Sequence, residues 1–200
     1  MISAIILAAD IKCVPVTEGL PYGRSTIVEE VVNNFLGSKV DEIVLVLGSE
    51  DTKIERKIED KPVKVVINPD YYQGLSSSIK AGLKAADERT SAVLIALGDQ
   101  PLVKAKVINR IISQYLEKEN MKGIVVPVHR GVRGHPTLLD IRYKDEIMNL
   151  SGNVGAREII QRHEEDLLEV EVDTASILSD IEADTDYLMQ MRKFSLLDKE

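Results

Sequence analysis

The clearest candidate for chemistry is an acidic residue at the end of an apolar run. Residues 92–97 are apolar, and Gly98, Asp99, Gln100 and Pro101 follow them. An Asp in this position can be a helix cap or a turn residue. It can also bind Mg²⁺, which prefers oxygen ligands and is usually held by one or two carboxylates together with substrate phosphates. We therefore treat Asp99 as a candidate metal ligand and catalytic residue.

A second acidic segment could complete such a metal site. In SDIEADTDY, residues 179–187, Asp180 and Glu182 alternate around Ile181. Alternate side chains of an extended chain point to the same side, so one of these carboxylates could meet Asp99 from across a sheet. A solvated acidic turn explains the same spacing, and both interpretations stay open.

The segment NPDYYQGLSSSIKAG, residues 68–82, combines a glycine with three serines. Gly74 allows the backbone to approach a ligand closely. The serines open a predicted helix, and the free N–H groups of a first helical turn attract anions or carbonyl groups. One serine, Ser76, is enough to cap an ordinary helix. Because Ser77 and Ser78 exceed that need, the pattern favours a nucleotide-binding loop.

Two basic loops follow in the second half of the chain. In RGVRGHP, Arg130 and Arg133 precede His135, and guanidinium groups placed in this way suit an acidic or phosphorylated ligand. In LSGNVGAR, Asn153 is a candidate helix cap, and Arg157 lies one turn further along the same predicted helix. A structural histidine and a capped surface helix are the alternatives.

The elements that must position these residues alternate between apolar runs and segments of helical period. This alternation predicts an α/β sheet that is largely parallel in its first half. Right-handed crossovers place the carboxyl ends of parallel strands at one edge, where ligands bind. Strands are predicted at 3–9, 42–47, 63–67, 92–97, 123–128, 137–139 and 168–172, and helices at 26–36 (with a Thr26–Glu29 capping box), 76–86, 105–118, 153–162 and near 186–192.

Length and charge limit the class of protein. Two hundred residues suit a single domain, with a nucleotide-binding half over 1–102 and an acceptor half over 103–200. The net charge of −8 argues against broad binding to nucleic acid or to an anionic membrane. The single cysteine, Cys13, excludes an internal disulfide. The segment ISAIILAA is too short to span a bilayer and lacks a basic flank, so we expect a cytoplasmic protein.

Taken in order, ILAA, NPDYYQGLSSSIKAGL, ALGDQPLV, RGHP, GNVGAR and DIEADTDY resemble the molybdenum cofactor cytidylyltransferase family over nearly the whole chain. They are also similar to the guanylyltransferase that makes the related guanine dinucleotide cofactor. The resemblance implies a three-layer, mixed and mostly parallel sheet of the nucleotide-diphosphosugar transferase type. It implies Mg²⁺-dependent transfer of a nucleoside monophosphate to the phosphate of molybdopterin, with release of pyrophosphate. The GDQP loop and the triple serine favour CTP over GTP, and a molybdoenzyme that receives the cofactor is the implied partner.

The resemblance also implies roles for individual residues. Asp99 falls on the Mg²⁺-holding position, and Asp180 and Glu182 fall on a second acidic position. Lys12 and Arg24 are the remaining candidates for catalytic cations. The implied nucleotide-binding residues are Ala8, Ala9, Asp10, Gly74, Ser76, Ser77, Ser78 and Gly98, and the implied acceptor-binding residues are Arg133, His135, Asn153 and Arg157.

The first loop departs from the family pattern LAxGxSxRMGxxK. This chain reads LAADIKCVPVTEGLPYGRST, with Asp10 at the first glycine position and no RMG triplet. A carboxylate there repels a triphosphate unless it meets a metal ion. The connection is nevertheless long, and long connections of this kind are usually functional or mobile. Two hypotheses follow: a working nucleotidyltransferase, or a relative that binds nucleotide or cofactor without turnover.

Overall fold

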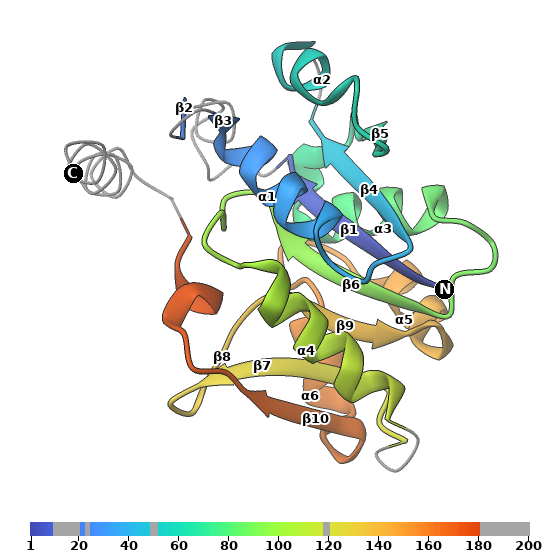
Figure 1. Cartoon of the computed structure of the whole chain (residues 1–200). Helices are drawn as coiled ribbons and strands as arrows, with labels where there is room; N and C mark the ends of the chain where they lie inside the picture. The colour runs from blue at the N-terminus through green and yellow to red at the C-terminus, as the bar shows by residue number, and fades with distance from the viewer. Residues whose placement is uncertain (10–20, 23–24, 49–51, 118–120, 181–200) are drawn as a thin grey trace, which may run out of the picture.

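The computed structural model describes residues 1–9, 21–22, 25–48, 52–117 and 121–180, and it contains a mixed β-sheet between two layers of helices (Figure 1). The strand order of the main sheet is β10-β7-β9-β6-β1-β4-β5, and β8 pairs with β7. A separate ribbon joins β2 (Pro21–Tyr22) to β3 (Ser25–Thr26). The strands of the main sheet are β1 (Ile2–Ala8), β4 (Glu42–Leu47), β5 (Lys64–Ile67), β6 (Ala92–Leu97), β7 (Ile124–His129), β8 (Val132–Arg133), β9 (Thr137–Asp140) and β10 (Leu167–Glu171).

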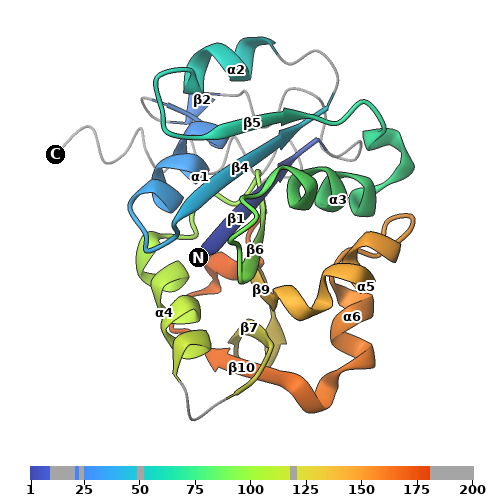
Figure 2. The same cartoon turned by 90° about the vertical axis from the view of Figure 1, so that its right-hand side faces the viewer.

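Helices cover both faces of the sheet. Figure 2 shows α1 and α4 on one side of the strands and α3, α5 and α6 on the other. The helices are α1 (Ile27–Leu36), α2 (Thr52–Ile58), α3 (Leu75–Ala85), α4 (Ala105–Leu116), α5 (Lys144–Asn149) and α6 (Arg157–Arg162), with 3₁₀ turns η1 (Tyr71–Gln73), η2 (Ile141–Tyr143), η3 (Glu164–Asp166) and η4 (Ala175–Leu178). Within the described ranges, no helix is long and apolar enough to cross a membrane.

The central strand β1 builds both cores through its alternation. Ala4 and Ile6 pack into the core under α1 and α4, whereas Ile5 and Leu7 pack into the core under α3, α5 and α6. All seven residues of β1 are buried, as expected for a strand whose successive side chains point to opposite, covered faces. This burial explains why β1 reads as a continuous apolar run in the sequence.

The direction of the strands brings many loops to one edge. β1 is parallel to β4 and β6, and β4 is parallel to β5. β9 runs antiparallel to both β6 and β7, so β6 and β7 point the same way, and β10 is parallel to β7. The carboxyl ends of these parallel strands and the amino end of β9 therefore share one edge, which confirms the mostly parallel sheet predicted from the sequence.

Helix starts agree with the sequence at α1 and differ at two others. The Thr26–Glu29 capping box is present, with the Glu29 N–H 3.3 Å from Thr26 Oγ1 and the Thr26 N–H 2.7 Å from Glu29 Oε2. α3 begins at Leu75 after Gly74, so Ser76 is not its cap. α6 begins at Arg157, so the prediction that Asn153 caps it is wrong. The helix predicted near 186–192 lies outside the described residues.

Candidate functional site

Asp99 lies at the point where the order of the strands reverses. From β1 the chain continues to β4 on one side, while β6 flanks β1 on the other. Ligands of open α/β sheets bind outside the strand ends at such a switch point. Asp99 follows the tip of β6 and is only 7% exposed. The structure therefore places the predicted metal ligand at the expected edge.

Gly98 brings the end of β6 directly against the end of β1. Its N–H donates to the carbonyl of Leu7 at 2.8 Å. A Cβ at residue 98 would lie 2.8 Å from the Cβ of Ala8, which is too close for any side chain. Ala8 and the neighbouring Ala9 are buried beside it. Three predicted nucleotide-binding residues, Ala8, Ala9 and Gly98, are thus brought together next to Asp99.

The start of α3 is occupied by a loop from the other half of the chain. The N–H of Leu75 donates to Asn153 Oδ1 at 3.2 Å, and the N–H of Ser76 donates to the carbonyl of Gly152 at 3.1 Å. Gly74 has a φ of +101°, and a Cβ there would lie 2.6 Å from the Gly152 carbonyl oxygen. The sequence-based expectation that these helix N–H groups are free for a ligand is therefore wrong. Gly74 is needed because two backbones meet here.

The serines of α3 are held by a residue that the sequence argument left without a role. Asn68, at the end of β5, donates its side-chain N–H groups to Ser77 Oγ at 2.9 Å and to Ser78 Oγ at 3.0 Å. Ser77 Oγ also donates to the carbonyl of Gly74 at 2.8 Å. These bonds fix the loop and the first turn of α3 relative to the sheet edge. The only available signal for Asn68 was its position at a predicted strand tip.

Three of the four predicted acceptor residues surround one pocket of about 450 Å³. Arg133 and His135 come from the chain around β8 and the start of β9, and Arg157 comes from the start of α6. Gln161 and Glu164, which were not predicted, also line this acceptor-side pocket. Asn153 is outside its lining and bonds to α3 instead. Three of the residues predicted for the acceptor side thus lie in one pocket, and the fourth, Asn153, lies elsewhere.

The two arginines of this pocket differ in whether a described carboxylate already pairs with them. Arg133 Nε lies 2.6 Å from Glu169 Oε1, and its Nη1 lies 3.6 Å from Glu164 Oε1. The hydrogen bond to Glu169 raises the pKa of Arg133 and keeps its charge locally compensated. Arg157 makes no ion pair with any other residue in the described ranges. Its guanidinium is therefore the group best able to meet a ligand phosphate.

His135 offers a ring nitrogen that has no hydrogen-bond partner among the described residues. Burial lowers its pKa, and the nearby carboxylate of Asp180 opposes that shift only in part. Its buried Nδ1 has no hydrogen-bond partner among the described residues. The backbone is fixed, because the His135 N–H donates to the carbonyl of Ile177 at 3.0 Å. The Nδ1 atom of a neutral imidazole at this position can donate a hydrogen bond to a ligand or accept one from it, depending on the tautomer.

Asp99 and Asp180 are the described carboxylates that could bind a hard divalent cation together with substrate oxygens. Asp99 lies two residues beyond the end of β6, and the carboxylate of Asp180 acts electrostatically on His135, which lies just before β9, the strand that pairs with β6. Carboxylate oxygens of this kind fit Mg²⁺. Among the residues that the structure describes, no group of three or more His, Cys, Asp or Glu side chains could hold a metal ion. The predicted residues Asp10, Lys12, Arg24 and Glu182 lie outside the described ranges.

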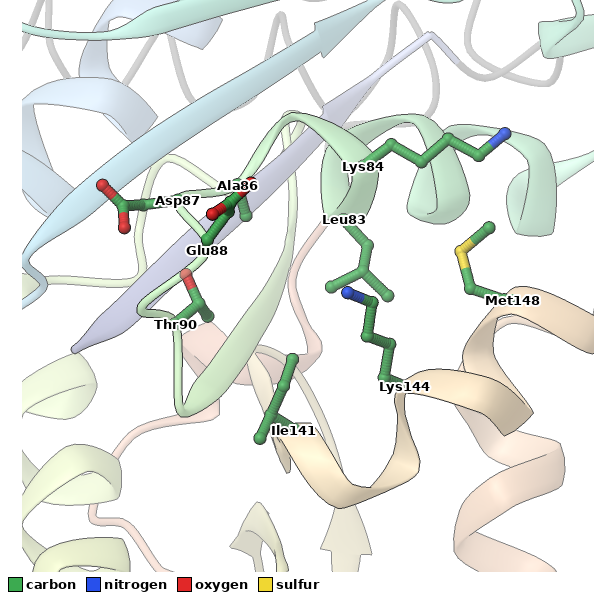
Figure 3. Close-up of a pocket in the computed structure, with 9 residues that line it drawn as sticks. All are labelled: Leu83, Lys84, Ala86, Asp87, Glu88, Thr90, Ile141, Lys144 and Met148. Atoms are coloured by element: carbon green, nitrogen blue, oxygen red, sulfur yellow. The ribbon is translucent and has the colours of Figure 1, made fainter.

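A separate cavity of about 310 Å³ lies at the opposite edge of the sheet and contains none of the predicted site residues. Figure 3 shows the Lys144 side chain rising from the start of α5 toward Leu83 of α3. Asp87, one of the two acids that line this cavity, is paired with Arg89 at 2.8 Å. The hydrogen bonds from Arg89 strongly lower the pKa of Asp87. The predicted site residues that the structure describes therefore lie at the carboxyl edge of the sheet and not in this cavity.

Comparison with known proteins identifies the family and the fold. A family model described as "MobA-like NTP transferase domain" matches residues 19–167. A molybdenum cofactor cytidylyltransferase of Escherichia coli is 27% identical over 177 residues, which is 88% of this chain and 87% of that protein. A nicotine blue oxidoreductase of Paenarthrobacter nicotinovorans is 29% identical over 149 residues, 72% of each chain. A manganese complex of a Mycobacterium tuberculosis protein has the same fold, with a TM-score of 0.81 and 22% identity over 96% of this chain and 97% of that one.

The fold is therefore that of the nucleotide-diphosphosugar transferases, as the sequence resemblance implied. The family match covers well over half of the chain, and the chain belongs to the MobA-like NTP transferase family. It is an enzyme of the nucleotidyltransferase class, related to molybdenum cofactor cytidylyltransferase.

Proposed function

We propose that this nucleotidyltransferase joins CMP, taken from CTP, to the phosphate of a molybdopterin-type acceptor and releases pyrophosphate. The observation that carries the proposal is the placement of Asp99 at the switch point, on the same sheet edge as a pocket lined by Arg133, His135 and Arg157. A polyphosphate and a phosphorylated acceptor would then meet at one edge. The choice of CTP is supported by the E. coli relative and by the triple serine.

The reaction needs little covalent chemistry from the protein. An oxygen of the acceptor phosphate attacks the α-phosphorus of CTP, forming a new P–O bond. The bond from the α-phosphorus to the bridging oxygen breaks at the same centre, and pyrophosphate carries away the electron pair. Catalysis therefore depends on placing the two phosphates in line and on stabilising negative charge.

Asp99 is the proposed holder of a divalent metal ion, with Asp180 and Glu182 as further candidates. When bound, Mg²⁺ would supply compensation for the charge of the triphosphate. The burial of Asp99 favours this role, because a carboxylate in a partly dry site interacts with a cation more strongly than one in water. The manganese complex of the M. tuberculosis relative supports a divalent ion in this fold.

The acceptor-side pocket suggests a division of labour among its polar residues. Arg157 would bind the acceptor phosphate, since its charge is not already compensated by a described carboxylate. His135 would give or take one hydrogen bond through Nδ1. Arg133, tied to Glu169, would form a fixed wall of the pocket. The halves 1–102 and 103–200 would then carry nucleotide and acceptor, respectively.

Pyrophosphate release tests this proposal directly. The protein is incubated with molybdopterin, Mg²⁺ and each of the four nucleoside triphosphates in turn. We expect release with CTP, dependent on both Mg²⁺ and the acceptor. Asp145→Ala, an exposed acid on α5, serves as a matched control for Asp99→Ala. Release with GTP alone would point to the guanylyltransferase reaction, and silence with all four triphosphates would contradict the proposal.

A further inference from the structure

A second pocket at the carboxyl edge lies on the face of the sheet that α1 and α4 cover. It has a volume of about 270 Å³ and is bounded by the start of α4 and by the chain that follows β10. Its polar lining consists of Lys104, Lys106, Arg110, Asp173, Thr174 and Ser176. We call it the α4 pocket. The acceptor-side pocket lies on the other face, against α6.

The charges at the start of α4 are arranged against the dipole of the helix. Lys106 and Arg110 are four residues apart, so two like charges share one helical face. A helix N-terminus is already positive, and the first turn of α4 contains no acidic residue. The N-cap residue, Lys104, makes no side-chain capping bond. Each of these features is relieved by an anion bound at this end of the helix.

Most of this positive charge is not compensated within the described part of the chain. Lys104 Nζ pairs with Glu30 Oε1 at 2.6 Å. Lys106 and Arg110 make no ion pair with another described residue. One carboxylate, that of Asp173, also lines the pocket and opposes an anion there. The lining still carries more positive than negative charge.

Ser176, on the opposite wall of the α4 pocket, points to a ligand independently of the charges on α4. Ser176 is 8% exposed, and its buried Oγ has no hydrogen-bond partner among the described residues. Its backbone N–H is fixed by Thr174 Oγ1 at 3.2 Å, which holds the start of η4. Buried hydroxyl groups are normally hydrogen-bonded, so an orphan that lines a pocket points to a missing acceptor. An anion would supply that acceptor.

We propose that the α4 pocket binds a phosphate group, either as the free ion or carried by a small molecule. Lys106, Arg110 and the first N–H groups of α4 would surround its oxygens, and Ser176 would donate its hydroxyl. Leu102, Val107 and Val172 form an apolar floor on which an attached body can lie. Leu102 is three residues beyond Asp99, so the ligand would rest on the connection that carries the catalytic acid.

Nuclear magnetic resonance titration of the full chain tests this site. Phenyl phosphate, inorganic phosphate and benzyl alcohol are added separately while the backbone amides are followed. We expect saturable shifts at Ala105, Lys106 and Ser176 with the phosphates and none with the alcohol. Tighter binding of phenyl phosphate would identify a phosphorylated small molecule, and equal binding would identify free phosphate.

Variants separate this site from the acceptor-side pocket. Lys106→Ala with Arg110→Ala should weaken binding about tenfold or more, and Asp173→Asn should strengthen it. Ser176→Ala should weaken binding without lowering the melting temperature, because the hydroxyl that it removes has no described partner. Arg56→Ala with Lys57→Ala, exposed on α2, removes the same charges elsewhere as a control. Shifts confined to residues around Arg157, or unchanged affinity in the Lys106/Arg110 variant, would overturn the proposal.

Discussion

The backbone N–H of Leu75 donates to the side chain of Asn153 across 3.2 Å, although 78 residues separate the two in the chain. The neighbouring N–H of Ser76 bonds to Gly152 in the same loop. Lys80 of α3 reaches the carbonyl of Leu150 at 2.8 Å, at the beginning of that loop. The loop before α6, which leads to Arg157, is thereby fixed to the helix that opens with three serines. A substitution in α3 or in the loop before α6 is therefore expected to affect both the nucleotide side and the acceptor side of the site.

Asn153→Ala removes the side-chain cap of α3. Loss of an N-cap interaction typically costs about 1 kcal/mol, so we expect the free energy of unfolding to fall by about that amount. Urea denaturation measures it. Asn149→Ala is the control, because the exposed side chain of Asn149 donates to the carbonyl of Asp145 within the same helix and contacts no other element through a described hydrogen bond. Equal stability of the Asn153 variant and the wild type would show that the cap contributes nothing.

Gly74→Ala tests the close approach of the two loops. The new Cβ would meet the Gly152 carbonyl oxygen at 2.6 Å, in a backbone conformation that non-glycine residues avoid. We expect a loss of about 2 to 4 kcal/mol in the free energy of unfolding. Gly131→Ala separates the two effects, because residue 131 also has a positive φ but nothing lies within 4 Å of its Cβ. Thermal unfolding should show a clearly smaller loss for Gly131→Ala, and equal losses would contradict the close contact.

Arg157→Ala should act on the acceptor and not on the nucleotide. Removing the guanidinium leaves the acceptor phosphate without its main cation, so we expect the KM for the acceptor to rise about tenfold or more. The KM for CTP should change little. Steady-state pyrophosphate release with each substrate varied in turn gives both constants. Arg89→Ala, at the opposite edge of the sheet, is the charge-matched control. A rise in the KM for CTP alone would place Arg157 on the nucleotide side.

The buried His135 should make stability depend on pH. Its pKa in the folded protein lies below the ordinary value of 6.5, so the unfolded chain binds a proton that the folded protein does not. The free energy of unfolding is therefore expected to fall as the pH drops below 6.5 toward the folded pKa. Urea titrations at several pH values should show a weaker decline for His135→Gln. The same decline in both proteins would mean that His135 does not cause it.

The sequence predicted those features of the fold that depend on local patterns. The apolar run of β1 and the Thr26–Glu29 box were recognised because strand burial and helix capping leave signals within a few residues. The position of Asp99 was predicted in the same way, from the apolar run that ends just before it. The short helices α2 and α5 were missed, because the few apolar residues in each do not establish a period.

Contacts between distant segments could not be predicted in this way. The side chain that caps α3 is that of Asn153, and no sequence pattern near residue 75 predicts this contact. The same contact explains why α6 starts later than expected, since the residue expected to cap it is used elsewhere. Glu169, the partner of Arg133, likewise comes from a strand that is distant in sequence. Such pairings arise only once the sheet has brought the two halves together.

The central claim is that Asp99 binds a divalent cation together with the nucleotide. Mn²⁺ binding followed by electron paramagnetic resonance in the presence of CTP, without acceptor, measures this most directly. The account predicts that Asp99→Asn weakens Mn²⁺ binding about tenfold or more and slows pyrophosphate release about a hundredfold or more, while Asp145→Asn changes neither. Binding of Mn²⁺ and CTP to Asp99→Asn that is as tight as binding to the wild type would contradict it.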